Sequence, residues 1–388
     1  MKKTVAHFIR KNTQLRSSFI QNQILNHIDY KPVIIFKYES NKNDGGFAEF
    51  NNNEIPVLNL WNERDVKSKL LYHYTKLITK EDVKKINEFL EKHKVHILHF
   101  HYGTDAGIYF PFLKKSSIPS VVSFYGYDAF SFPKRFWGYG RSYLNNRVFE
   151  PVTKIIAMTP EMKKDLLIIG CPKKKIIIHY HGVPSLLFQG ITKSYHRENR
   201  YFTLLNISSF DPVKGHIFIF EALKQLISKG INNITLKIAG YGFFERELRR
   251  FVAKNKLEEF VFFLGPLKYG SKEMIDELQN ADAFIHPSVV TKSDKEGIPG
   301  AVVEAMFAGL PVISTFHGGI PYVIENEKTG LLVKEWDIAA LAEKIKMLID
   351  NADLREKLGR SGQKFALENL DLHNKEQELE DIYYSLLS

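Results

Sequence analysis

The sequence has almost no cysteine and no long apolar run. Cys171 is the single cysteine among 388 residues, so an internal disulfide and a multi-cysteine metal site are both excluded. Such usage is typical of a reducing compartment. No stretch of about 18 apolar residues occurs, so the sequence predicts no membrane-spanning helix. It also lacks low-complexity tracts, a glycine period and a sustained heptad, which excludes disordered, collagen-like and coiled-coil chains.

What is present is an ordinary globular composition, with 44% hydrophobic and 25% charged residues. At roughly 100–200 residues per domain, the length predicts two domains, each with its own core. The N-terminus begins like a signal peptide, but its apolar run is short and contains His7, so we expect a first β-strand there. We therefore expect a cytoplasmic protein, and attachment to the inner face of the membrane stays open.

The net charge of +10 is unevenly distributed. Residues 1–185 hold 29 Lys and Arg against 16 Asp and Glu, a balance of +13, whereas the remainder holds 25 against 28, a balance of −3. This asymmetry predicts a large anionic partner for the first half only, with anionic lipid and nucleic acid as candidates. No nucleic-acid reader motif accompanies the charge, so we expect no nucleic-acid partner.

Strand-like runs alternate with amphipathic helices twice along the chain. The expected strands are 4–9, 33–37, 97–100, 120–124, 154–158 and 176–180, then 202–207, 235–239, 260–264, 283–286, 312–314 and 331–333. Helix-period stretches between them include 81–93, 160–169, 216–228 and 272–279. This alternation predicts an α/β fold of two Rossmann-like, doubly wound domains that face a ligand cleft.

Interruptions of this pattern set the expected domain boundaries. Gly, Pro, Ser and polar residues break the alternation after residue 182. We therefore expect a first domain at 1–185, a linker at 186–200 and a second domain at 201–370. The amphipathic segment 371–388 is expected to pack back on the first domain.

The stretch 294–321 carries the strongest chemical pattern. Glu296 lies in a Gly- and Pro-rich loop, and Glu304 follows eight residues later near the start of a helix. Both carboxylates can then lie at the helix N-terminus, whose backbone N–H groups suit a phosphate. Carboxylates accept hydrogen bonds from sugar hydroxyls. Taken alone, the pair is better explained by a solvated loop Glu and a capping Glu.

Lys214 and Gly215 lie at a strand-to-helix turn, where a diphosphate can be held by charge and by close approach of the backbone. A surface lysine is the simpler explanation of that pair by itself. Gly240 and Gly242 also follow a strand, but the third glycine of a dinucleotide fingerprint is missing. NAD binding is therefore not predicted.

These pieces recur in one order, and residues 201–335 resemble the nucleotide-sugar-binding domain of family-4 glycosyltransferases, which are retaining enzymes of the GT-B fold. The matching segments are 214–216, 240–242, 264–266, 281–288, 296–299, 304–306, 309–312, 318–321 and 329–333. Each segment alone is weakly specific, whereas the ordered series is highly specific.

The resemblance implies roles for individual residues. Glu296 and Lys214 would be the catalytic residues, Glu296 on the donor sugar's hydroxyls and Lys214 on the diphosphate. Glu304 would bind the ribose diol. The other donor-binding positions implied are Gly297, Ile298, Pro299, Gly242, Gly265, Leu267 and Ser209. The leaving phosphate would take the acceptor's proton, and no metal or other cofactor is expected.

The first half resembles the family more loosely. The segments 99–105 and 124–128 look like two family signatures, which places His101, Gly103, Tyr125 and Asp128 at the acceptor side or cleft. A region such as 14–20 would lie in the acceptor loop. His96, His99 and His101 are close in sequence, but neither a cysteine nor a carboxylate supports a metal cluster.

Three departures from the family pattern concern contacts with the donor. Tyr125 stands where a His is frequent, Ser209 where an Arg commonly joins the Lys, and Tyr322 where Glu is usual. Lys214 would then carry more of the diphosphate's charge. The basic and aromatic segment 133–141 fits either a lipid headgroup surface or an acceptor loop.

The sequence thus predicts a retaining glycosyltransferase of bacterial polysaccharide type. It would move a hexose or N-acetylhexosamine from a nucleotide-diphosphate sugar, expected to be a UDP-sugar, to a surface polysaccharide or lipid-linked glycan. Three alternatives remain open: a GT-B nucleotide-sugar epimerase, a glycogen-synthase-like polymerase, and a non-enzymatic basic scaffold that binds lipid or nucleic acid.

Overall fold

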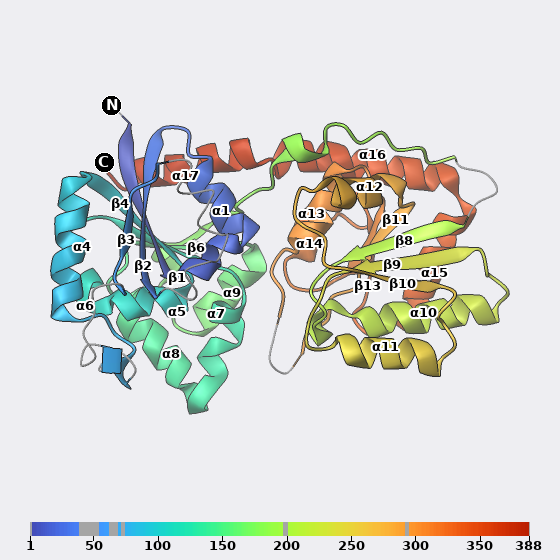
Figure 1. The fold of residues 1–388 in the computed structure, drawn as a ribbon, viewed down its shortest axis with the longest axis horizontal. Helices are drawn as coiled ribbons and strands as arrows, with labels where there is room; N and C mark the ends of the chain where they lie inside the picture. The colour runs from blue at the N-terminus through green and yellow to red at the C-terminus, as the bar shows by residue number, and fades with distance from the viewer. Residues whose placement is uncertain are drawn as a thin grey trace. The chain divides into compact units, whose positions relative to one another are not determined.

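Parallel strands alternate with helices in the computed structural model, which describes residues 2–38, 54–61, 69–70, 74–196, 201–291 and 295–387 (Figure 1). The chain divides into two compact units, residues 1–182 with 372–388 and residues 183–371. The polypeptide therefore passes from one unit to the other twice. Each unit has one parallel sheet with helices against it, so the predicted α/β fold of two Rossmann-like domains is confirmed.

The first unit is built on a seven-stranded parallel sheet of order β3-β2-β1-β4-β5-β6-β7. Its strands are β1 (Lys3–Lys11), β2 (Tyr30–Tyr38), β3 (Val57–Asn59), β4 (Val95–His101), β5 (Ser120–Phe124), β6 (Lys154–Ala157) and β7 (Ile176–Ile178). Six of these were expected. The edge strand β3 was not, because three residues are too few to show an alternating pattern. The strand order reverses between β1 and β4.

Two helices of the first unit begin at a side chain that caps them. The Thr79 side chain accepts a hydrogen bond from the backbone N–H of Asp82, and the Asp82 carboxylate accepts one from Thr79 N–H. The Thr159 side chain accepts a hydrogen bond from the backbone N–H of Met162, and Gly170 ends that region with φ +103°. The helices are α1 (Ser18–Leu25), α4 (Lys80–Lys92), α5 (Gly103–Ala106), α6 (Phe110–Leu113), α7 (Tyr127–Phe130), α8 (Tyr139–Leu144), α9 (Pro160–Ile168) and α17 (Leu372–Ser385).

The second unit has a six-stranded parallel sheet of order β10-β9-β8-β11-β12-β13. Its strands are β8 (Phe202–Ile207), β9 (Ile234–Ala239), β10 (Val261–Gly265), β11 (Ala283–His286), β12 (Val312–Thr315) and β13 (Leu331–Val333). All six were expected, because aliphatic residues buried on both faces make nearly continuous apolar runs. The order reverses between β8 and β11, which is where ligands bind in open α/β sheets.

Helices cover both faces of this sheet (Figure 1). On one face α10 packs against α11 and α15, and on the other α13 packs against α16. The helices are α10 (His216–Ser228), α11 (Glu245–Lys254), α12 (Lys272–Asn280), α13 (Gly300–Phe307), α14 (Ile320–Val323), α15 (Ile338–Asp350) and α16 (Ala352–Asn369).

The segment 186–200, expected to be a linker, differs from that expectation in its described part. Tyr195 is buried, and its hydroxyl donates a hydrogen bond to the Gly309 carbonyl at 2.7 Å. The Arg355 guanidinium donates to the Tyr195 carbonyl at 2.6 Å. These contacts make residues 186–196 part of the second unit, because a polar, irregular segment still satisfies its backbone groups by packing.

Helix α17 belongs to the first unit although it follows the second in sequence. Leu379 and Tyr383 are fully buried in that unit. The Glu380 carboxylate accepts hydrogen bonds from the backbone N–H groups of Ile28, Asp29 and Tyr30 at 2.8, 2.8 and 3.3 Å. Separately, none of the helices in the described residues combines the length and the apolar character that a membrane crossing requires.

Candidate active site

The turn after β8 and the segment after β11 come into direct contact in the second unit. Gly215 ends the short helical turn Pro212–Lys214 with φ +74°. A Cβ on Gly215 would lie 2.0 Å from the carbonyl oxygen of Pro287, so no residue other than glycine fits. This close approach places Lys214 beside Glu296.

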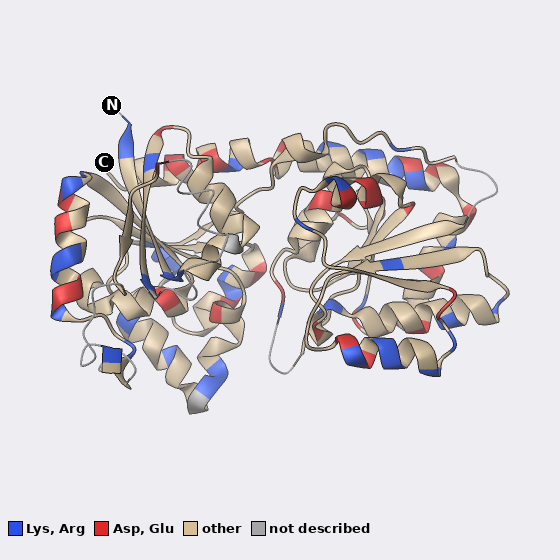
Figure 2. Ribbon diagram, in the orientation of Figure 1, with Lys and Arg blue, Asp and Glu red and all other residues tan. Residues whose placement is uncertain are grey.

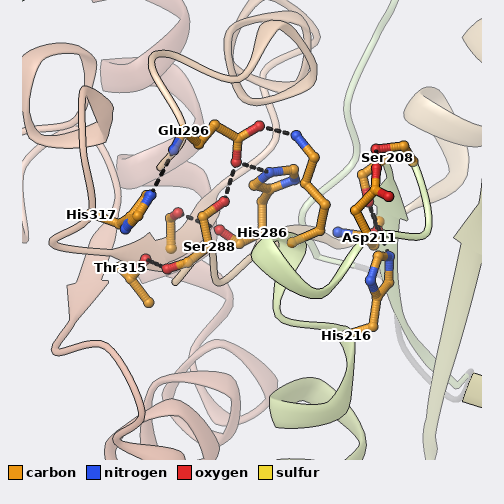
Figure 3. A network of polar contacts seen from close by, with 12 residues as sticks. Ser208, Asp211, His216, His286, Ser288, Glu296, Thr315 and His317 are labelled. Atoms are coloured by element: carbon orange, nitrogen blue, oxygen red, sulfur yellow. Dashed lines mark hydrogen bonds and ion pairs between the residues drawn. The ribbon is translucent and has the colours of Figure 1, made fainter. Parts of the chain in front are cut away.

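Glu296 is held by side chains from both segments (Figure 3). One carboxylate oxygen forms an ion pair with Lys214 Nζ. The other accepts a hydrogen bond from Ser288 Oγ and lies 3.3 Å from His286 Nε2. The side chains of Lys214 and Glu296 are only 18% and 11% exposed, so the pair lies mostly out of water. Lys214 and Glu296, predicted separately from the sequence, therefore form one cluster.

Two histidines orient this cluster. The backbone N–H of Glu296 donates to His317 Nε2 at 3.0 Å, and His317 Nδ1 lies 2.9 Å from Glu335 Oε1. His317 therefore accepts at Nε2 and donates at Nδ1, as a neutral ring does. Burial lowers the pKa of His317, although Glu335 opposes the shift. Burial, followed by the nearby Lys214, lowers the pKa of His286 well below its usual value. With neutral rings here, the charge of the Glu296 carboxylate is balanced by its ion pair with Lys214.

Glu304 has a different environment from Glu296. It lies on α13 and is 7% exposed, with its Oε1 turned back toward Gly300 at the helix N-terminus. Among the described residues none donates a hydrogen bond to its carboxylate. Burial raises the pKa of Glu304 to about 7. The carboxyl is thus positioned to accept hydrogen bonds from a ligand that enters the site.

The loop before α13 is fixed by backbone contacts. Pro299 is the N-cap residue of α13, and the Gly297 carbonyl accepts a hydrogen bond from Gly319 N–H at 3.0 Å. Gly318 has φ +52°, and a Cβ on it would lie 2.1 Å from the Glu296 carbonyl oxygen. Residues 297–299, including the half-buried Ile298, thus hold Glu296 against the start of α13.

The remaining predicted donor-binding residues follow β8, β9 and β10 at the same edge of the sheet. Ser209 is exposed after β8 and donates to Asp211 Oδ2 at 2.6 Å. Gly242 follows β9, where a Cβ would lie 2.5 Å from the Phe210 carbonyl oxygen. Gly265 ends β10 with φ +75°, and Leu267 is half-buried just after it. They share the carboxyl edge of the sheet with Lys214.

His286, Ser288, His317 and Glu335 were not assigned roles from the sequence. The sequence did offer one indication, since His286 ends β11 and Ser288 follows two residues later. Residues at strand ends where the strand order reverses often contact ligands. His317 and Glu335 follow β12 and β13 and meet only in three dimensions.

In the first unit, the predicted acceptor-side residues form one hydrogen-bonded group. The Asp128 carboxylate accepts from the backbone N–H groups of Gly103 and Tyr125 at 2.8 and 3.0 Å. Asp128 is completely buried, and burial raises its pKa to about 6. Asp128 thus braces the loops after β4 and β5. His101 Nδ1 lies 2.7 Å from the Tyr125 hydroxyl.

A chain of buried histidines continues from His101. His101 Nε2 lies 2.9 Å from His7 Nδ1, and His7 Nε2 lies 2.8 Å from His27 Nε2. His27 Nδ1 lies 2.5 Å from Glu376 and 3.3 Å from Glu380 on α17. Burial alone would lower the pKa of His27, but the two carboxylates raise it to about 9. The charged end of this chain therefore lies at α17 and its neutral end at Tyr125.

His96, His99 and His101, which are close in sequence, do not form one cluster in the structure. His96 Nδ1 accepts a hydrogen bond from Thr4 N–H at 3.2 Å, away from the chain. His99 contacts the Tyr383 hydroxyl at 2.6 Å and Ser123 Oγ at 2.8 Å. The ring nitrogens of His99 and His101 are thus hydrogen-bonded to protein groups in this structure.

Comparison with known families agrees with this division of the chain. The family model described as Glycosyl transferases group 1 matches residues 190–365, and the one described as Glycosyltransferase Family 4 matches residues 46–185. The amylovoran biosynthesis glycosyltransferase AmsK of Erwinia amylovora is 32% identical over 207 residues, covering 53% of this chain and 48% of that protein. The chain spans about half the length of the first curated relatives it matches, between 43% and 48%.

Solved structures resemble the whole chain. The Anabaena protein Alr3699/HepE in complex with UDP has a TM-score of 0.78 at 17% identity, covering 99% of this chain and 100% of that one. A glycosyltransferase from Rickettsia africae has a TM-score of 0.76 at 20% identity, covering 100% and 99%. These likenesses concern the fold. Because two family models account for successive parts of one chain, and its units match the GT-B fold, the chain belongs to the glycosyltransferases that join a family-4 unit to a group 1 unit.

Proposed function

We propose that this protein is a retaining glycosyltransferase that moves a hexose or N-acetylhexosamine from a nucleotide-diphosphate sugar, with UDP as the nucleotide. The observation that supports this most directly is the Lys214–Glu296 pair at the point where the strand order reverses. The UDP in the Anabaena HepE structure, a neighbour of the same fold, supports the choice of nucleotide.

In this proposal Lys214 and Glu296 contact different parts of the donor. Lys214 contacts the diphosphate, and helix α10 starts two residues later with its N-terminal N–H groups at the same place. Glu296 accepts hydrogen bonds from the sugar hydroxyls while Ser288 and His286 keep its carboxylate in place. Preorganised positive charge beside the leaving group is worth most where the site excludes water.

In the reaction, the acceptor oxygen bonds to the anomeric carbon as the bond from that carbon to the diphosphate oxygen breaks. The departing phosphate takes the acceptor's proton, so no protein base is needed. The donor and acceptor gain their mutual orientation from being held on one sugar face. We propose that Lys214 and the helix N-termini replace a metal, which predicts full activity in a chelator.

Glu304 is proposed to accept hydrogen bonds from the ribose diol. Its buried carboxyl has a raised pKa and has no hydrogen-bond donor among the described residues, so a pair of hydroxyls would satisfy it. The acceptor is proposed to be a surface polysaccharide or a lipid-linked glycan, handled at the inner face of the cytoplasmic membrane. The name of the Erwinia relative and the basic first half of the chain support this class.

The test is ligand-observed NMR with UDP-, GDP- and ADP-sugars. We expect one nucleotide class to bind the wild type and to be hydrolysed slowly with its anomeric configuration retained. Glu296→Gln should lower turnover by about 10²–10³-fold, since it removes a charged contact to the reacting sugar. Glu304→Gln should mainly weaken nucleotide binding.

Glu325→Gln is the matched control, because Glu325 is exposed and pairs with Lys328 outside the site. It should leave binding and turnover unchanged. A donor sugar epimerised without any acceptor would establish the epimerase alternative instead. Absence of binding by every nucleotide sugar at millimolar concentration would contradict the proposal as a whole.

A further inference from the structure

A cavity of about 730 Å³ opens in the first unit, separate from the donor site. Lys11 lines it from the end of β1, Tyr102 and Thr104 from the start of α5 after β4, and Tyr127 from the start of α7 after β5. The cavity thus lies at the carboxyl ends of the strands on both sides of the β1–β4 reversal, where open α/β sheets bind ligands. Its volume falls within the roughly 300–1,000 Å³ of small-molecule sites.

Most of the described charged residues that line this cavity are cations. Its described charged residues are five cations against one carboxylate, Asp105, which leaves a balance of +4; the cations are Arg10, Lys11, Lys76, Arg135 and Arg147. Asp105 already pairs with Arg10 at 2.6 Å and accepts from Gln14 Nε2 at 2.7 Å. Its negative charge is therefore already shared between Arg10 and Gln14.

Arg135 and Arg147 are held by aromatic rings. Arg135 lies 5.2 Å from the ring centre of Tyr127, and Arg147 lies 4.9 Å from that of Tyr143. Among the described residues, no carboxylate lies within ion-pair distance of either guanidinium. Their N–H donors can therefore turn toward a ligand without breaking an ion pair.

Aromatic rings also form much of the wall. The Tyr143 hydroxyl donates to the Thr104 carbonyl at 2.9 Å, which fixes that ring, and Tyr139 remains 52% exposed. Flat apolar ring faces with a polar edge suit the C–H face of a pyranose ring and its hydroxyls. The combination of aromatic faces and guanidinium groups fits a sugar that also carries negative charge.

We propose that this cavity binds the acceptor and that the acceptor is an anionic glycan, with a carboxylate or a phosphate on the sugar unit bound here. The inference rests on the proposed function, which it deepens by naming the acceptor's chemical class. A neutral glycan would use the aromatic faces but would offer no anion to the Arg135 and Arg147 guanidinium groups. A flat lipid surface would contact the cations but would not fill the hollow between them.

The experiment compares sugars that differ only in charge. Trigalacturonic acid is titrated against its methyl ester, which has the same rings without the carboxylates, and glucose 1-phosphate against glucose. Binding is followed by calorimetry and ligand-observed NMR with the wild type, Arg135→Gln and Arg147→Gln. Lys134→Gln is the matched control, because Lys134 is exposed in the same loop, packs on Phe130 and does not line the cavity.

We expect trigalacturonic acid or glucose 1-phosphate to bind at least about tenfold more tightly than its neutral counterpart. Which of the two charged sugars shows this difference identifies the anion as a carboxylate or a phosphate. Each arginine variant should weaken that binding about five- to tenfold, whereas Lys134→Gln should change it less than about twofold. Unchanged thermal unfolding of the arginine variants establishes that they fold.

Equal binding of charged and neutral sugars would overturn the inference. A second contrary result is that the protein binds only vesicles of anionic phospholipid and that all three variants bind these vesicles equally weakly. That result would identify a lipid-binding surface. UDP-sugar binding is measured in the same samples. If the donor binds and is hydrolysed but no anionic sugar binds, this inference fails and the proposed function stands; if the donor does not bind, the proposed function fails.

Discussion

At the residue scale, two carboxylates eight positions apart have opposite electrostatic environments. Glu296 is compensated by Lys214 and hydrogen-bonded by Ser288, whereas Glu304 is buried beside apolar neighbours of α13. Pairing favours the charged form of a carboxyl and burial favours the neutral form. Glu296 is therefore held as a charged carboxylate, whereas Glu304 can lose its proton when a ligand supplies hydrogen-bond donors.

The raised pKa of Glu304 makes the stability of the second unit depend on pH. Because its folded-state pKa is about 7 against an ordinary 4.5, the stability it contributes at low pH is lost as pH rises through about 7. The Gln side chain of Glu304→Gln does not ionise, so the variant does not lose this stability as pH rises. Relative to wild type, the variant should gain about 2–3 kcal/mol between pH 5 and pH 8.

The measurement is chemical denaturation of wild type and Glu304→Gln at the two pH values without ligand. Glu325→Gln, an exposed carboxyl, should show no such gain. If the free energies of unfolding of Glu304→Gln and wild type differ by the same amount at both pH values, burial does not disfavour the charged form of Glu304.

At the element scale, helix α17 completes the first unit by charge as well as by packing. Its two buried carboxylates face His27, whose ring continues into His7 and His101. Glu380 also accepts three backbone N–H groups at the start of β2. A helix from the C-terminal end of the chain thus supplies the acceptors that this buried, charged histidine requires.

Glu380→Gln should therefore destabilise the first unit by about 3–5 kcal/mol at neutral pH, because it removes one partner of a buried ion pair. The raised pKa of His27 stabilises the fold fully below its ordinary 6.5, and this contribution is lost as pH rises through about 9. The deficit of the variant should accordingly shrink at pH 9.5.

Urea denaturation followed by the fluorescence of the first unit measures this deficit. Asp381→Asn is the control, since Asp381 is the next residue on the same helix and is exposed. A deficit that does not change between pH 7 and pH 9.5 would mean that His27 does not carry the charge.

At the scale of the whole molecule, the chain leaves the first unit after Gly182 and returns to it at Leu372. The second unit is therefore continuous in sequence, whereas the first is made from both ends of the chain. Each has its own core and its own sheet. At the reversal of strand order, the first unit has the cavity and the second has the Lys214–Glu296 pair.

Truncation after Asp371 should consequently affect the two units differently. It removes the buried Leu372, Leu379 and Tyr383 from the first unit, which should lose about 5 kcal/mol or more at roughly 1.5–3 kcal/mol per side chain. Calorimetry should show one transition shifted to lower temperature or lost. UDP binding by the second unit should persist, and its loss would show that the second unit does not fold independently.

Much of the fold was predictable from the sequence because it depends on local pattern. The six strands of the second unit, the cap at Thr159 and helix α10 all follow from apolar runs and capping residues within a few positions. The edge strand β3 and the packing of residues 186–196 were not, since short irregular segments show their role only in their contacts.

The sequence by itself determined the class of molecule, the two carboxylates of the candidate site and the basic character of the first half, because these are properties of residue type and spacing. Only the tertiary structure decided which groups meet. His317 joins Glu335, His7 joins His27, and Arg135 turns to Tyr127, and each of these pairs comes from different elements. Their partners are chosen by strand order and loop packing, which no local pattern encodes.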